Sequence, residues 1–388
     1  MSVLADRNVV LGVSGSIAAV KTVELAHELR REGANVRAVM TDSACSIIHP
    51  WALEFATENE VVTEITGKVE HVDLFGADGW ADVFLLAPAT ANTVGKIAAG
   101  IDDTTVTTCA TTALGQGIPL VVAPAMHEPM YDHPGVLDSL DTLESWGVTF
   151  VDPRLEEGKA KIATETAIVA TTARVAGDGS LTDRHVVITS GPTSETIDPV
   201  RVLTNRASGK TGRALARACY VRGADVTLLH DGADVPYATV EQVESAAEMT
   251  EAAVETVAAG ADALISAAAI SDYTIEASDE KIRSGGELTL ELEPTPKLLD
   301  TVRESAPELT MIGFKLETSG DDDALITMAR EQLERVGLSF VVANRADALA
   351  GDETRVIIVR DEKTTSYTGT KADVANDIAK ELASEFDG

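Results

Sequence analysis

Twice in the chain a short apolar strand pattern leads into a glycine-bearing turn and then into a predicted helix. The first instance runs from Val9 to Ala19 and the second from Val186 to Asp198. Glycines at such a junction let the backbone approach a phosphate, and the following helix N-terminus offers unpaired N–H groups to an anion. Tight packing at the turn explains either pattern alone equally well, because a lone glycine pattern is a weak signal. Together they predict two nucleotide-type pockets.

Two further sequence motifs of the first half, which we also call words, combine small residues with polar ones. They are Ala87–Thr93 (APATANT) and Ala123–Tyr131 (APAMHEPMY), and each directly follows a predicted buried strand. Both are therefore expected at the carboxyl edge of a parallel sheet, where open α/β folds bind ligands. Small residues would let a flat ring or a phosphate lie against the backbone, with Thr90 and Asn92 as hydrogen-bond partners. A proline-bounded loop is the plain alternative, but two such loops on adjacent strands favour a pocket.

Histidines supply the next candidates, and the chain has seven of them. A lone histidine is more often a surface or capping residue than a catalytic one, so spacing alone does not assign catalysis to His71. His127, Glu128, Asp132 and His133 are all of metal-ligand type, but they lack the helical HExxH spacing. Metal binding is therefore not favoured, and the sequence names no metal ligand.

The charge of the chain limits its partners. The formal net charge is −32, from 63 acidic and 31 basic residues among 388. Such a field repels nucleic acid and anionic membranes, and it opposes phosphorylated ligands unless local cations and backbone N–H groups outweigh it. Small molecules are therefore the expected partners. We interpret the acidity as an adaptation to high salt, because screening shortens like-charge repulsion to about 3 Å at 1 M.

The cysteines predict a reducing compartment. Cys45, Cys109 and Cys219 lie far apart, without a C-x-x-C pair, so neither a disulfide framework nor a zinc knuckle is expected. The first residues reach a strand pattern without a charged and then apolar signal segment, and no apolar run approaches about 18 residues. A cytoplasmic location is the expectation.

Apolar runs alternate with helical patterns in both halves. The strands expected in the first half are Val9–Val13, Val36–Met40, Val83–Ala87 and Leu120–Ala123, with helices at Ala18–Glu32 and Ala91–Ala99. Those expected in the second half are Val186–Thr189, Val226–Leu229, Ala263–Ala267, Met311–Phe314, Phe340–Ala343 and Val356–Val359, with a closing helix at Lys371–Phe386. This alternation predicts an α/β protein with two doubly wound, Rossmann-like domains. The polar, glycine-containing segment Arg174–Asp183 is the expected linker, which places the domains at residues 1–178 and 183–388.

The words of the first half, taken as a set, resemble the flavin-dependent cysteine decarboxylase family, which includes phosphopantothenoylcysteine decarboxylase. The set comprises the Gly12–Ala18 turn (GVSGSIA), Met40-Thr41, His71 within HVDL, APATANT, and the PAM word with Met130 three residues beyond His127. In that family FMN oxidises a substrate thiol, which eases loss of the neighbouring carboxylate, and the reduced flavin returns the electrons. The resemblance implies that His71 is catalytic and that FMN is held by Ser14, Gly15, Ser16, Thr41, Ala89, Thr90, Ala91 and Asn92.

Two positions depart from that family. Many members have asparagine after the PAM word to grip the substrate carboxylate, whereas this chain has His127, whose imidazole can also donate a hydrogen bond. Bacterial members carry a loop cysteine that helps to complete the reduction, whereas the comparable stretch here is Gly158–Ile162, with Lys161 about where the cysteine would fall. Lys161 or water would then supply the final proton, or the half-reaction ends differently.

The word Ser208–Thr211 (SGKT) looks like the end of a Walker A loop, but the earlier glycine position is occupied by Thr204, so a P-loop is rejected. The longer words Thr189–Arg201 and Thr204–Gly212 resemble phosphopantothenate–cysteine ligase. So do the following: Ser266–Tyr273, Glu280–Arg283, Gly313–Thr318 and Val342–Asn344.

That second resemblance implies a carboxylate that is activated by a nucleotide and then attacked by an amine, with cations and amide donors stabilising the charged states. Arg201, Asn205 and Lys281 match catalytic positions, Asn205 at the acyl-phosphate centre and Lys281 beside nucleotide phosphates. From sequence alone, Lys281 reads as a solvated surface lysine. The nucleotide site would comprise Gly191, Ala267, Ala268, Asp272, Gly313 and Phe314.

The whole chain thus resembles the bifunctional Dfp-type enzymes of coenzyme A biosynthesis. The resemblance implies CTP-dependent ligation of 4′-phosphopantothenate with cysteine, using Mg²⁺ or another divalent cation, and then FMN-dependent decarboxylation to 4′-phosphopantetheine. It also implies a homo-oligomer with trimeric flavin domains and dimeric ligase domains. An active ligase with an altered or inactive flavin domain stays an alternative, as does a non-catalytic flavin- or nucleotide-binding module. CTP is not distinguished from ATP. A two-domain dehydrogenase is disfavoured, because neither turn has a full GxGxxG followed by a suitably placed acid.

Overall fold

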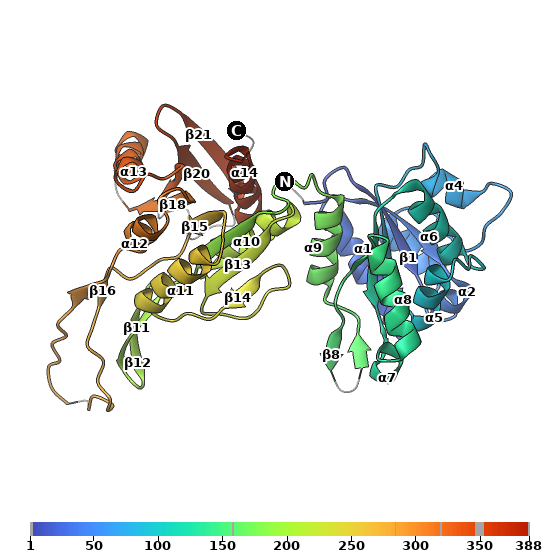
Figure 1. The fold of residues 1–388 in the computed structure, drawn as a ribbon, viewed down its shortest axis with the longest axis horizontal. Helices are drawn as coiled ribbons and strands as arrows, with labels where there is room; N and C mark the ends of the chain where they lie inside the picture. Colours follow the sequence, from blue (N-terminus) through green and yellow to red (C-terminus); the bar gives the residue numbers. More distant parts are fainter. Residues whose placement is uncertain (1–2, 157–158, 284, 319, 346–352, 387–388) are drawn as a thin grey trace. The chain divides into compact units, whose positions relative to one another are not determined.

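The computed structural model describes residues 3–156, 159–283, 285–318, 320–345 and 353–386. The chain divides into two compact units, Ser2–Asp178 and Gly179–Gly388. Each unit has its own central sheet with helices on both faces (Figure 1). None of the helices in the described part of the chain combines the length and apolar character that a bilayer crossing requires.

The sheet of the first unit is parallel, with the strand order β3-β2-β1-β4-β5-β7. Its strands are β1 (Asn8–Val13), β2 (Asn35–Met40), β3 (Val61–Val62), β4 (Val83–Ala89), β5 (Leu120–Pro124) and β7 (Thr149–Phe150). The central strands are buried along their length because helices cover both faces, as the continuous apolar runs predict. The order of strands reverses at β1, which β2 and β4 flank.

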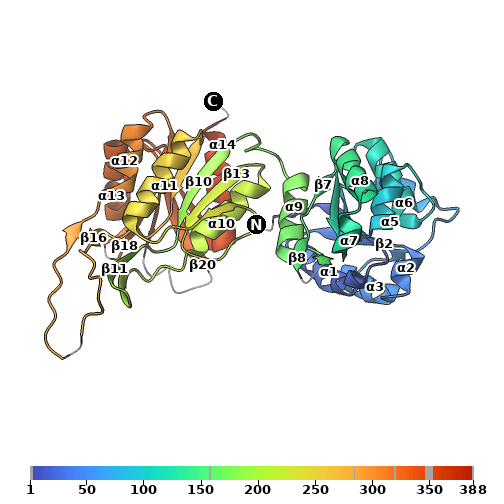
Figure 2. The same cartoon turned by 60° about the horizontal axis from the view of Figure 1, so that its bottom comes forward.

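Helices α1, α3 and α9 pack on one face of this sheet, and α4, α5, α6 and α8 form the other layer (Figure 2). The helices are η1, a 3₁₀ helix (Ile17–Lys21), α1 (Thr22–Arg31), α2 (Asp42–Cys45), α3 (Pro50–Thr57), α4 (Glu70–Phe75), α5 (Ala91–Ala98), α6 (Thr105–Gln116), α7 (Glu128–Tyr131), α8 (Pro134–Ser145) and α9 (Glu165–Ala176). The single helix expected at Ala18–Glu32 is thus a 3₁₀ turn followed by α1. A small antiparallel sheet adds β6 (Met126–His127), β8 (Arg154–Glu156) and β9 (Lys159–Lys161).

The second unit contains an eight-stranded sheet ordered β14-β13-β10-β15-β18-β19-β20-β21. Its strands are β10 (His185–Ser190), β13 (Asp225–His230), β14 (Thr239–Glu241), β15 (Ala263–Ser266), β18 (Thr310–Glu317), β19 (Phe340–Arg345), β20 (Glu353–Val359) and β21 (Thr364–Thr370). The doubly wound part is parallel from β14 to β19, as predicted. The last two strands are antiparallel, because a short hairpin at residues 360–363 joins them.

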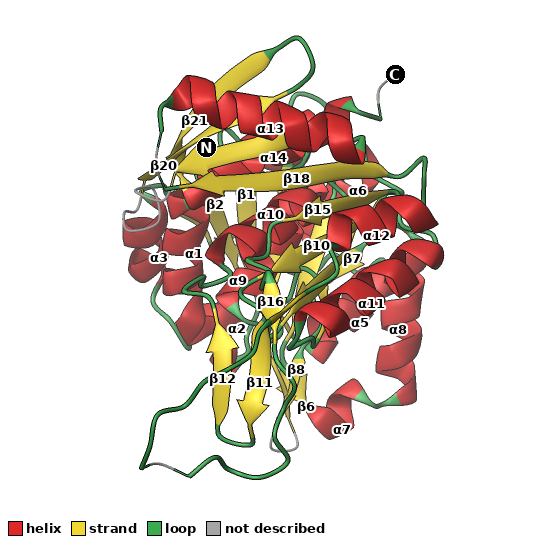
Figure 3. Ribbon diagram, turned by 90° about the vertical axis from the view of Figure 1, so that its left-hand side faces the viewer, coloured by secondary structure: helices red, strands yellow, loops and turns green. Residues whose placement is uncertain are grey.

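Helices α10 and α14 cover one face of this sheet, and α11, α12 and α13 cover the other (Figure 3). The helices are α10 (Lys210–Val221), α11 (Ala246–Ala258), α12 (Leu298–Ser305), α13 (Asp322–Val336) and α14 (Lys371–Ser384). Local capping explains where α11 and α14 begin, because Ser245 and Thr370 each form a reciprocal capping box with the residue three positions on. The left-handed Gly337 ends α13.

The sequence prediction of strand, turn and helix over Val186 to Asp198 is wrong in its last part. After the turn at Gly191 the chain forms an antiparallel hairpin, β11 (Ser194–Asp198) and β12 (Arg201–Thr204), before α10 begins at Lys210. A second short pair, β16 (Tyr273–Thr274) with β17 (Glu293–Pro294), frames a long excursion over residues 275–292. Both segments project beyond the main sheet of this unit (Figure 3). Sequence reasoning missed them because their few residues pair only with each other.

The predicted linker also begins too early. Helix α9 continues to Ala176, with Arg174 in its last turn, so only the end of the segment Arg174–Asp183 connects the two units. The apolar face of α9 keeps these residues helical, because Ile168, Val169 and Ala173 are buried.

Candidate functional site

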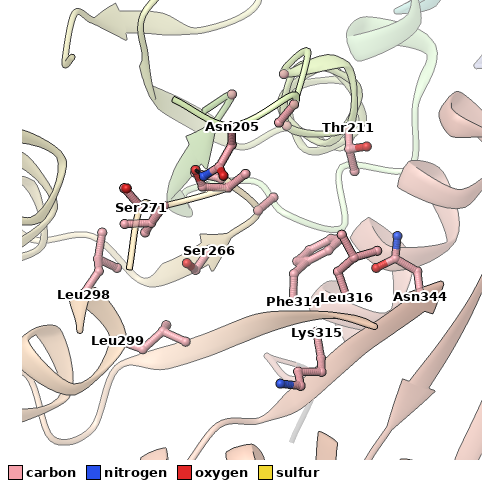
Figure 4. Close-up of a pocket in the computed structure, with 18 of the residues that line it drawn as sticks. Asn205, Thr211, Ser266, Ser271, Leu298, Leu299, Phe314, Lys315, Leu316 and Asn344 are labelled. Atoms are coloured by element: carbon pink, nitrogen blue, oxygen red, sulfur yellow. Dashed lines mark hydrogen bonds between the residues drawn. The ribbon is translucent and has the colours of Figure 1, made fainter. Parts of the chain in front are cut away.

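A cavity of about 900 Å³ opens in the second unit at the carboxyl edge of its parallel strands. Gly191 follows β10 and Ser266 ends β15, while Phe314 and Asn344 extend from β18 and β19 into the lining. Figure 4 shows Asn205 and Thr211 across the cavity from Phe314 and Leu316. The strand order reverses at β10, between β13 and β15, and such switch points are where doubly wound sheets bind ligands.

The lining contains most of the residues predicted for the second half. The predicted residues that line it are Gly191, Asn205, Ala267, Ala268, Asp272 and Phe314. Gly313 directly precedes Phe314 but does not itself line the cavity. A Cβ at Gly313 would lie 2.8 Å from Leu338 Cδ1, so glycine is needed here for close packing against Leu338. Arg201 and Lys281 are also outside the lining.

Hydrogen bonds join the walls of the cavity. Asn205 Nδ2 donates to the carbonyl of Ala269 at 2.9 Å, and the amide of Ala269 donates to the carbonyl of Gly191 at 2.8 Å. The amide of Ala268 donates to Thr189 Oγ1 at 3.1 Å. These bonds connect the turn after β10, the segment after β12 and the loop after β15. The cavity is therefore formed before a ligand binds.

The charge of the lining is opposite to that of the chain. Six cations line the cavity: Arg206, Lys210, Lys297, Lys315, Arg335 and Lys371. Only two carboxylates do so, Asp272 and Glu331. Lys297, Lys315 and Arg335 form ion pairs with Asp or Glu side chains, whereas Arg206, Lys210 and Lys371 form none with other described residues. A chain with 63 acidic and 31 basic residues thus concentrates free positive charge at one cavity, as an anionic ligand requires.

Sequence reasoning missed part of this cationic lining. Lys297, Arg335 and Lys371 were not singled out, and Lys315 stood in a recognised word without a role. Lys371 is the first residue of α14 after the Thr370 cap, so its place at a helix start was readable from sequence. Arg335 lies near the end of α13, and only the tertiary fold brings it to the cavity.

Arg201 does not line the cavity but forms hydrogen bonds with Asp198 and Ile282, and we call this group of three residues the tie. Its Nη1 donates to the Asp198 carboxylate and, at 3.1 Å, to the carbonyl of Ile282. Asp198 also accepts from the amides of Val200 and Ile282, at 2.9 and 3.1 Å. Burial acts to raise the pKa of this carboxyl, but these amide bonds and Arg201 outweigh it, so the pKa of Asp198 lies below its ordinary value. The tie fixes the excursion beside Lys281, whose side chain is exposed.

In the first unit, the predicted FMN residues also gather at a carboxyl edge. Ser14–Ser16 follow β1, Thr41 follows β2, and Thr90–Asn92 follow β4. Ser14 Oγ donates to the carbonyl of Pro88 at 2.8 Å and accepts from the amide of Thr90 at 3.0 Å. Because Ser14 is only 1% exposed, its hydroxyl joins the ends of β1 and β4 rather than facing a ligand.

The hydroxyls of Ser16, Thr41 and Thr90 cap the starts of η1, α2 and α5. A Cβ at Gly15 would lie 2.4 Å from Ser43 Cβ, so only glycine fits this turn. Ala89 is fully buried, Ala91 is half-buried and Asn92 is exposed. The edge therefore offers backbone turns, capped helix starts and one free amide, without a formal charge among its predicted ligands. These features fit a flavin phosphate cradle.

His71 lies on α4, and its buried Nδ1 atom has no hydrogen-bond partner among the residues that the structure describes. Such an orphaned polar atom is costly unless a ligand or proton transfer uses it. Among the described residues, no hydrogen bond joins His71 to the turn at Ser14–Ser16. His127 is exposed and pairs through its backbone with Lys159 of β9.

The metal interpretation of the His127–His133 segment gains no support. Within the described residues, no group of three or more histidine, cysteine or acidic side chains is placed to hold a metal ion. His133 caps α8 instead, since its Nδ1 accepts from the amide of Gly135 at 3.1 Å.

The segment carrying Lys161 is strand β9, which pairs with β6 beside His127. Gly158 lies outside the described residues. Cys109 and Cys219 are buried, and burial raises the pKa of each thiol to about 12. Burial and nearby Asp42 raise the pKa of Cys45 as well. No cysteine of the chain occupies the Lys161 segment.

Comparison with known proteins identifies the family. Residues 2–177 match the flavoprotein family model, and residues 181–386 match the model for the DNA/pantothenate metabolism flavoprotein C-terminal domain. The coenzyme A biosynthesis bifunctional protein CoaBC of Thermococcus kodakarensis is 49% identical over 362 residues, covering 92% of this chain and 89% of that protein. The chain belongs to the CoaBC family. The CoaBC protein of Methanocaldococcus jannaschii is 36% identical over 385 residues, covering 98% of this chain and 94% of that protein.

A solved C-terminal domain of a CoaBC protein is 30% identical, covers 54% of this chain and 99% of its own, and superposes with a TM-score of 0.46. Membership of the CoaBC family makes the chain a bifunctional enzyme of coenzyme A biosynthesis, which ligates and then decarboxylates. The predicted family, enzyme class and two-domain α/β fold are therefore confirmed. The alternative of a non-catalytic binding module is not favoured.

Proposed function

We propose that the second unit performs the ligation, joining 4′-phosphopantothenate to cysteine with CTP and a divalent cation in the 900 Å³ cavity. One observation carries this assignment: six cations against two carboxylates line the cavity of a chain whose net charge is −32. Both the nucleotide and the phosphorylated acid are anions, and fixed cations also stabilise charge that develops during acyl activation. The divalent cation would enter with the nucleotide phosphates, since the described residues offer it no ready cluster of ligands.

Within this cavity we propose that Asn205, through its amide, donates to the activated carboxyl group, and that Ala267, Ala268 and Asp272 read the base or ribose. Phe314 would shape the base pocket. Lys281 would act at nucleotide phosphates through the excursion over residues 275–292, and Arg201 would hold that excursion in place through Asp198 and Ile282. Gly191 would let its backbone turn toward a phosphate, because its positive φ is a conformation that glycine adopts readily.

A pair of variants on α14 tests the cationic cavity. Lys371 is the first residue of this helix and lines the cavity, whereas Lys380 lies exposed near its other end. We expect Lys371→Gln to lower kcat/KM for CTP by about tenfold or more, as the loss of one charge-assisted contact of about 1.5–3 kcal/mol predicts. Lys380→Gln makes the same charge change and should leave it within about twofold. Equal effects from the two variants, measured by pyrophosphate release, would argue against this cavity.

We further propose that the first unit decarboxylates the ligation product with FMN held at the β1, β2 and β4 edge. Ser16, Thr41, Thr90 and Asn92 would surround it with hydroxyl and amide groups, and Gly15 would let the backbone approach its phosphate. When bound, FMN supplies reversible two-electron oxidation of the substrate thiol. The flavoprotein match over residues 2–177 supports this assignment.

His71 would hold or accept a substrate proton, because an imidazole can do both and its buried Nδ1 has no partner in the described part of the chain. His127 would donate a hydrogen bond to the substrate carboxylate, and Lys161 or water would supply the final proton. The absorbance spectrum of the purified protein after FMN addition tests the assignment. Near-stoichiometric flavin bands are expected, and a protein that retains no FMN would contradict it.

We also propose that the enzyme is a homo-oligomer, with trimeric packing of the first unit and dimeric packing of the second. Large apolar side chains exposed on the first unit support this, with Ile17 at 78%, Trp51 at 72% and Phe55 at 77% exposure. On the second unit, Val200 and the alternating Leu288, Leu290 and Leu292 are exposed on the projecting segments. Light scattering coupled to gel filtration would measure the assembly, and a monomer at micromolar concentration would refute the proposal. Cytoplasmic location and salt adaptation stay predictions.

A further inference from the structure

His230, at the end of β13, is buried against glycines beside the ligase cavity. Only 3% of this residue is exposed. A Cβ on Gly191 would lie 3.0 Å from its Nδ1, one on Gly209 would lie 2.8 Å from its Cε1, and one on Gly232 would lie 2.1 Å from its Nε2. Gly191 and Gly209 both line the cavity and both have positive φ. The imidazole therefore occupies the space that lets these two turns approach each other.

Both ring nitrogens of His230 have fixed partners. Nε2 lies 3.0 Å from Arg213 Nη1, and Nδ1 lies 3.2 Å from the carbonyl oxygen of Ser190. A guanidinium only donates, so Nε2 must accept, and a carbonyl only accepts, so Nδ1 must carry the hydrogen. The contacts thus select one tautomer, with hydrogen on Nδ1.

The same groups extend to the loop that forms one wall of the cavity. Arg213 Nη2 donates to the carbonyl of Ser208 at 2.9 Å, and Ser190 Oγ donates to the carbonyl of Gly209 at 3.1 Å. A chain of bonds therefore runs from the ends of β10 and β13, through the imidazole and Arg213, to the Ser208–Lys210 loop. This loop belongs to the Ser208–Thr211 motif (SGKT), which is not part of a P-loop.

We propose that His230, as its Nδ1–H tautomer, is a positioning residue that holds the Gly191 turn and the Ser208–Lys210 loop in the geometry that binds the nucleotide. This inference rests on the proposed ligase function of the second unit. His230 is outside the cavity lining and acts through Arg213 and the backbone. Its loss should therefore weaken nucleotide binding more than it slows turnover of the bound complex.

Two substitutions separate the two ring contacts. In His230→Asn, the shorter amide can still donate to Ser190 but cannot reach Arg213, whereas in His230→Gln, the amide oxygen can accept from Arg213. His185 supplies the matched control, because it lies at the opposite end of β10 and its Nε2 contacts Thr227 Oγ1 at 2.8 Å. We expect His230→Asn to raise the Kd for CTP about tenfold, or about 1.4 kcal/mol. His230→Gln should recover most of this, and His185→Asn should stay within about twofold of the unmodified protein.

Titration calorimetry with CTP and Mg²⁺, without 4′-phosphopantothenate or cysteine, measures these affinities, and the imidazole ¹⁵N spectrum reports the tautomer directly. A protonated Nε2 in that spectrum, or an unchanged CTP affinity in His230→Asn, would overturn the proposal. If the unmodified protein fails to bind CTP, the ligase assignment fails instead. Hydrogen exchange at the Ser208–Lys210 amides then decides the positioning role: faster exchange in His230→Asn, but not in His185→Asn, supports it, and equal exchange in all three proteins overturns it.

Discussion

The anion sites that we propose for the two units share one architecture but use different chemical groups. In the second unit, six cationic side chains converge on a cavity at the carboxyl edge of the sheet. In the first unit, the residues proposed to hold FMN carry no formal charge, and Ser16, Thr41 and Thr90 already cap helices with their hydroxyls. Strand order reverses at β1 in one sheet and at β10 in the other, so both sites occupy a switch point.

This difference suits the two proposed ligands, a nucleotide substrate in the second unit and a flavin cofactor in the first. A nucleoside triphosphate carries several negative charges, so a cavity lined by several cationic side chains suits it. A flavin monophosphate stays bound and has one phosphate, which backbone N–H groups at a glycine turn can hold without long cations. The acidic surface of the chain makes the cationic cavity the more exceptional of the two sites. Substitutions and salt should therefore affect the two units in different ways.

The largest expected effect comes from filling the glycine turn of the first unit. Gly15→Ala places a methyl group 2.4 Å from Ser43 Cβ, and overpacking of this kind costs about 1–3 kcal/mol. We expect the variant to retain less than about a tenth of the flavin per chain, while ligation stays within about twofold. Absorbance spectra and pyrophosphate release measure the two outcomes.

Gly115→Ala is the matched control, because a Cβ at Gly115 meets nothing within 4 Å. It should retain its flavin. Equal flavin loss in both variants would trace the effect to general instability, and ligation that falls together with the flavin would contradict the separation of the two sites.

A smaller effect is expected at the tie between Asp198 and Arg201. The pKa of Asp198 lies below its ordinary value, so the carboxylate stabilises the fold above about pH 4, and this stabilisation is lost as the pH falls through the lowered value. Asp198→Asn should remove this part of the acid dependence and lower the melting temperature at neutral pH. Melting curves between pH 2 and pH 7 measure it.

Arg201→Gln tests whether the tie is one interaction. Because Arg201 and Asp198 bind each other and both bind Ile282, their substitutions should lower the melting temperature less than additively when combined. Asp279→Asn, at an exposed position of the same excursion, is the control. Strictly additive losses would show that Arg201 acts elsewhere.

Added salt should stabilise the fold but weaken the binding of CTP. Screening relieves repulsion among the 63 acidic residues, so the melting temperature should rise between 0.1 and 2 M KCl. The same screening weakens attraction between CTP and the cationic cavity, so the KM for CTP should rise by a few-fold, while flavin content stays constant. A melting temperature in dilute buffer as high as that in 2 M KCl would contradict the salt-adaptation hypothesis.

The smallest expected effect concerns thiol chemistry. Cys109 and Cys219 are buried with pKa values raised to about 12, and no cysteine lies in the Lys161 segment. Iodoacetamide at pH 7.5 should therefore leave decarboxylation within about twofold. Cys45→Ser controls for alkylation at the half-exposed cysteine near Thr41. Strong inhibition that persists in Cys45→Ser would show that a buried thiol takes part.

The parallel core was predictable because buried parallel strands are continuous apolar runs, as at Val9–Val13 and Val186–Thr189. The hairpin Ser194–Thr204 was not, since its pairing is local, β12 buries no residue, and two of the three residues that β11 buries are the acids Glu195 and Asp198. The motif after β4 placed Thr90 at the carboxyl edge of the sheet, whereas Asn205 was singled out only through the resemblance to the ligase family. The place of Arg335 in the cavity and the proposed role of His230 depend on contacts between segments far apart in sequence, which no local pattern encodes.

Product analysis of one variant tests most directly whether the two units perform successive steps. The His71→Asn protein, supplied with 4′-phosphopantothenate, cysteine, CTP, Mg²⁺ and FMN, should convert its substrates to phosphopantothenoylcysteine and stop there, while the unmodified enzyme continues to 4′-phosphopantetheine. Mass spectrometry of both reactions distinguishes the compounds. Formation of 4′-phosphopantetheine by His71→Asn at the unmodified rate would contradict the assignment of decarboxylation to the first unit.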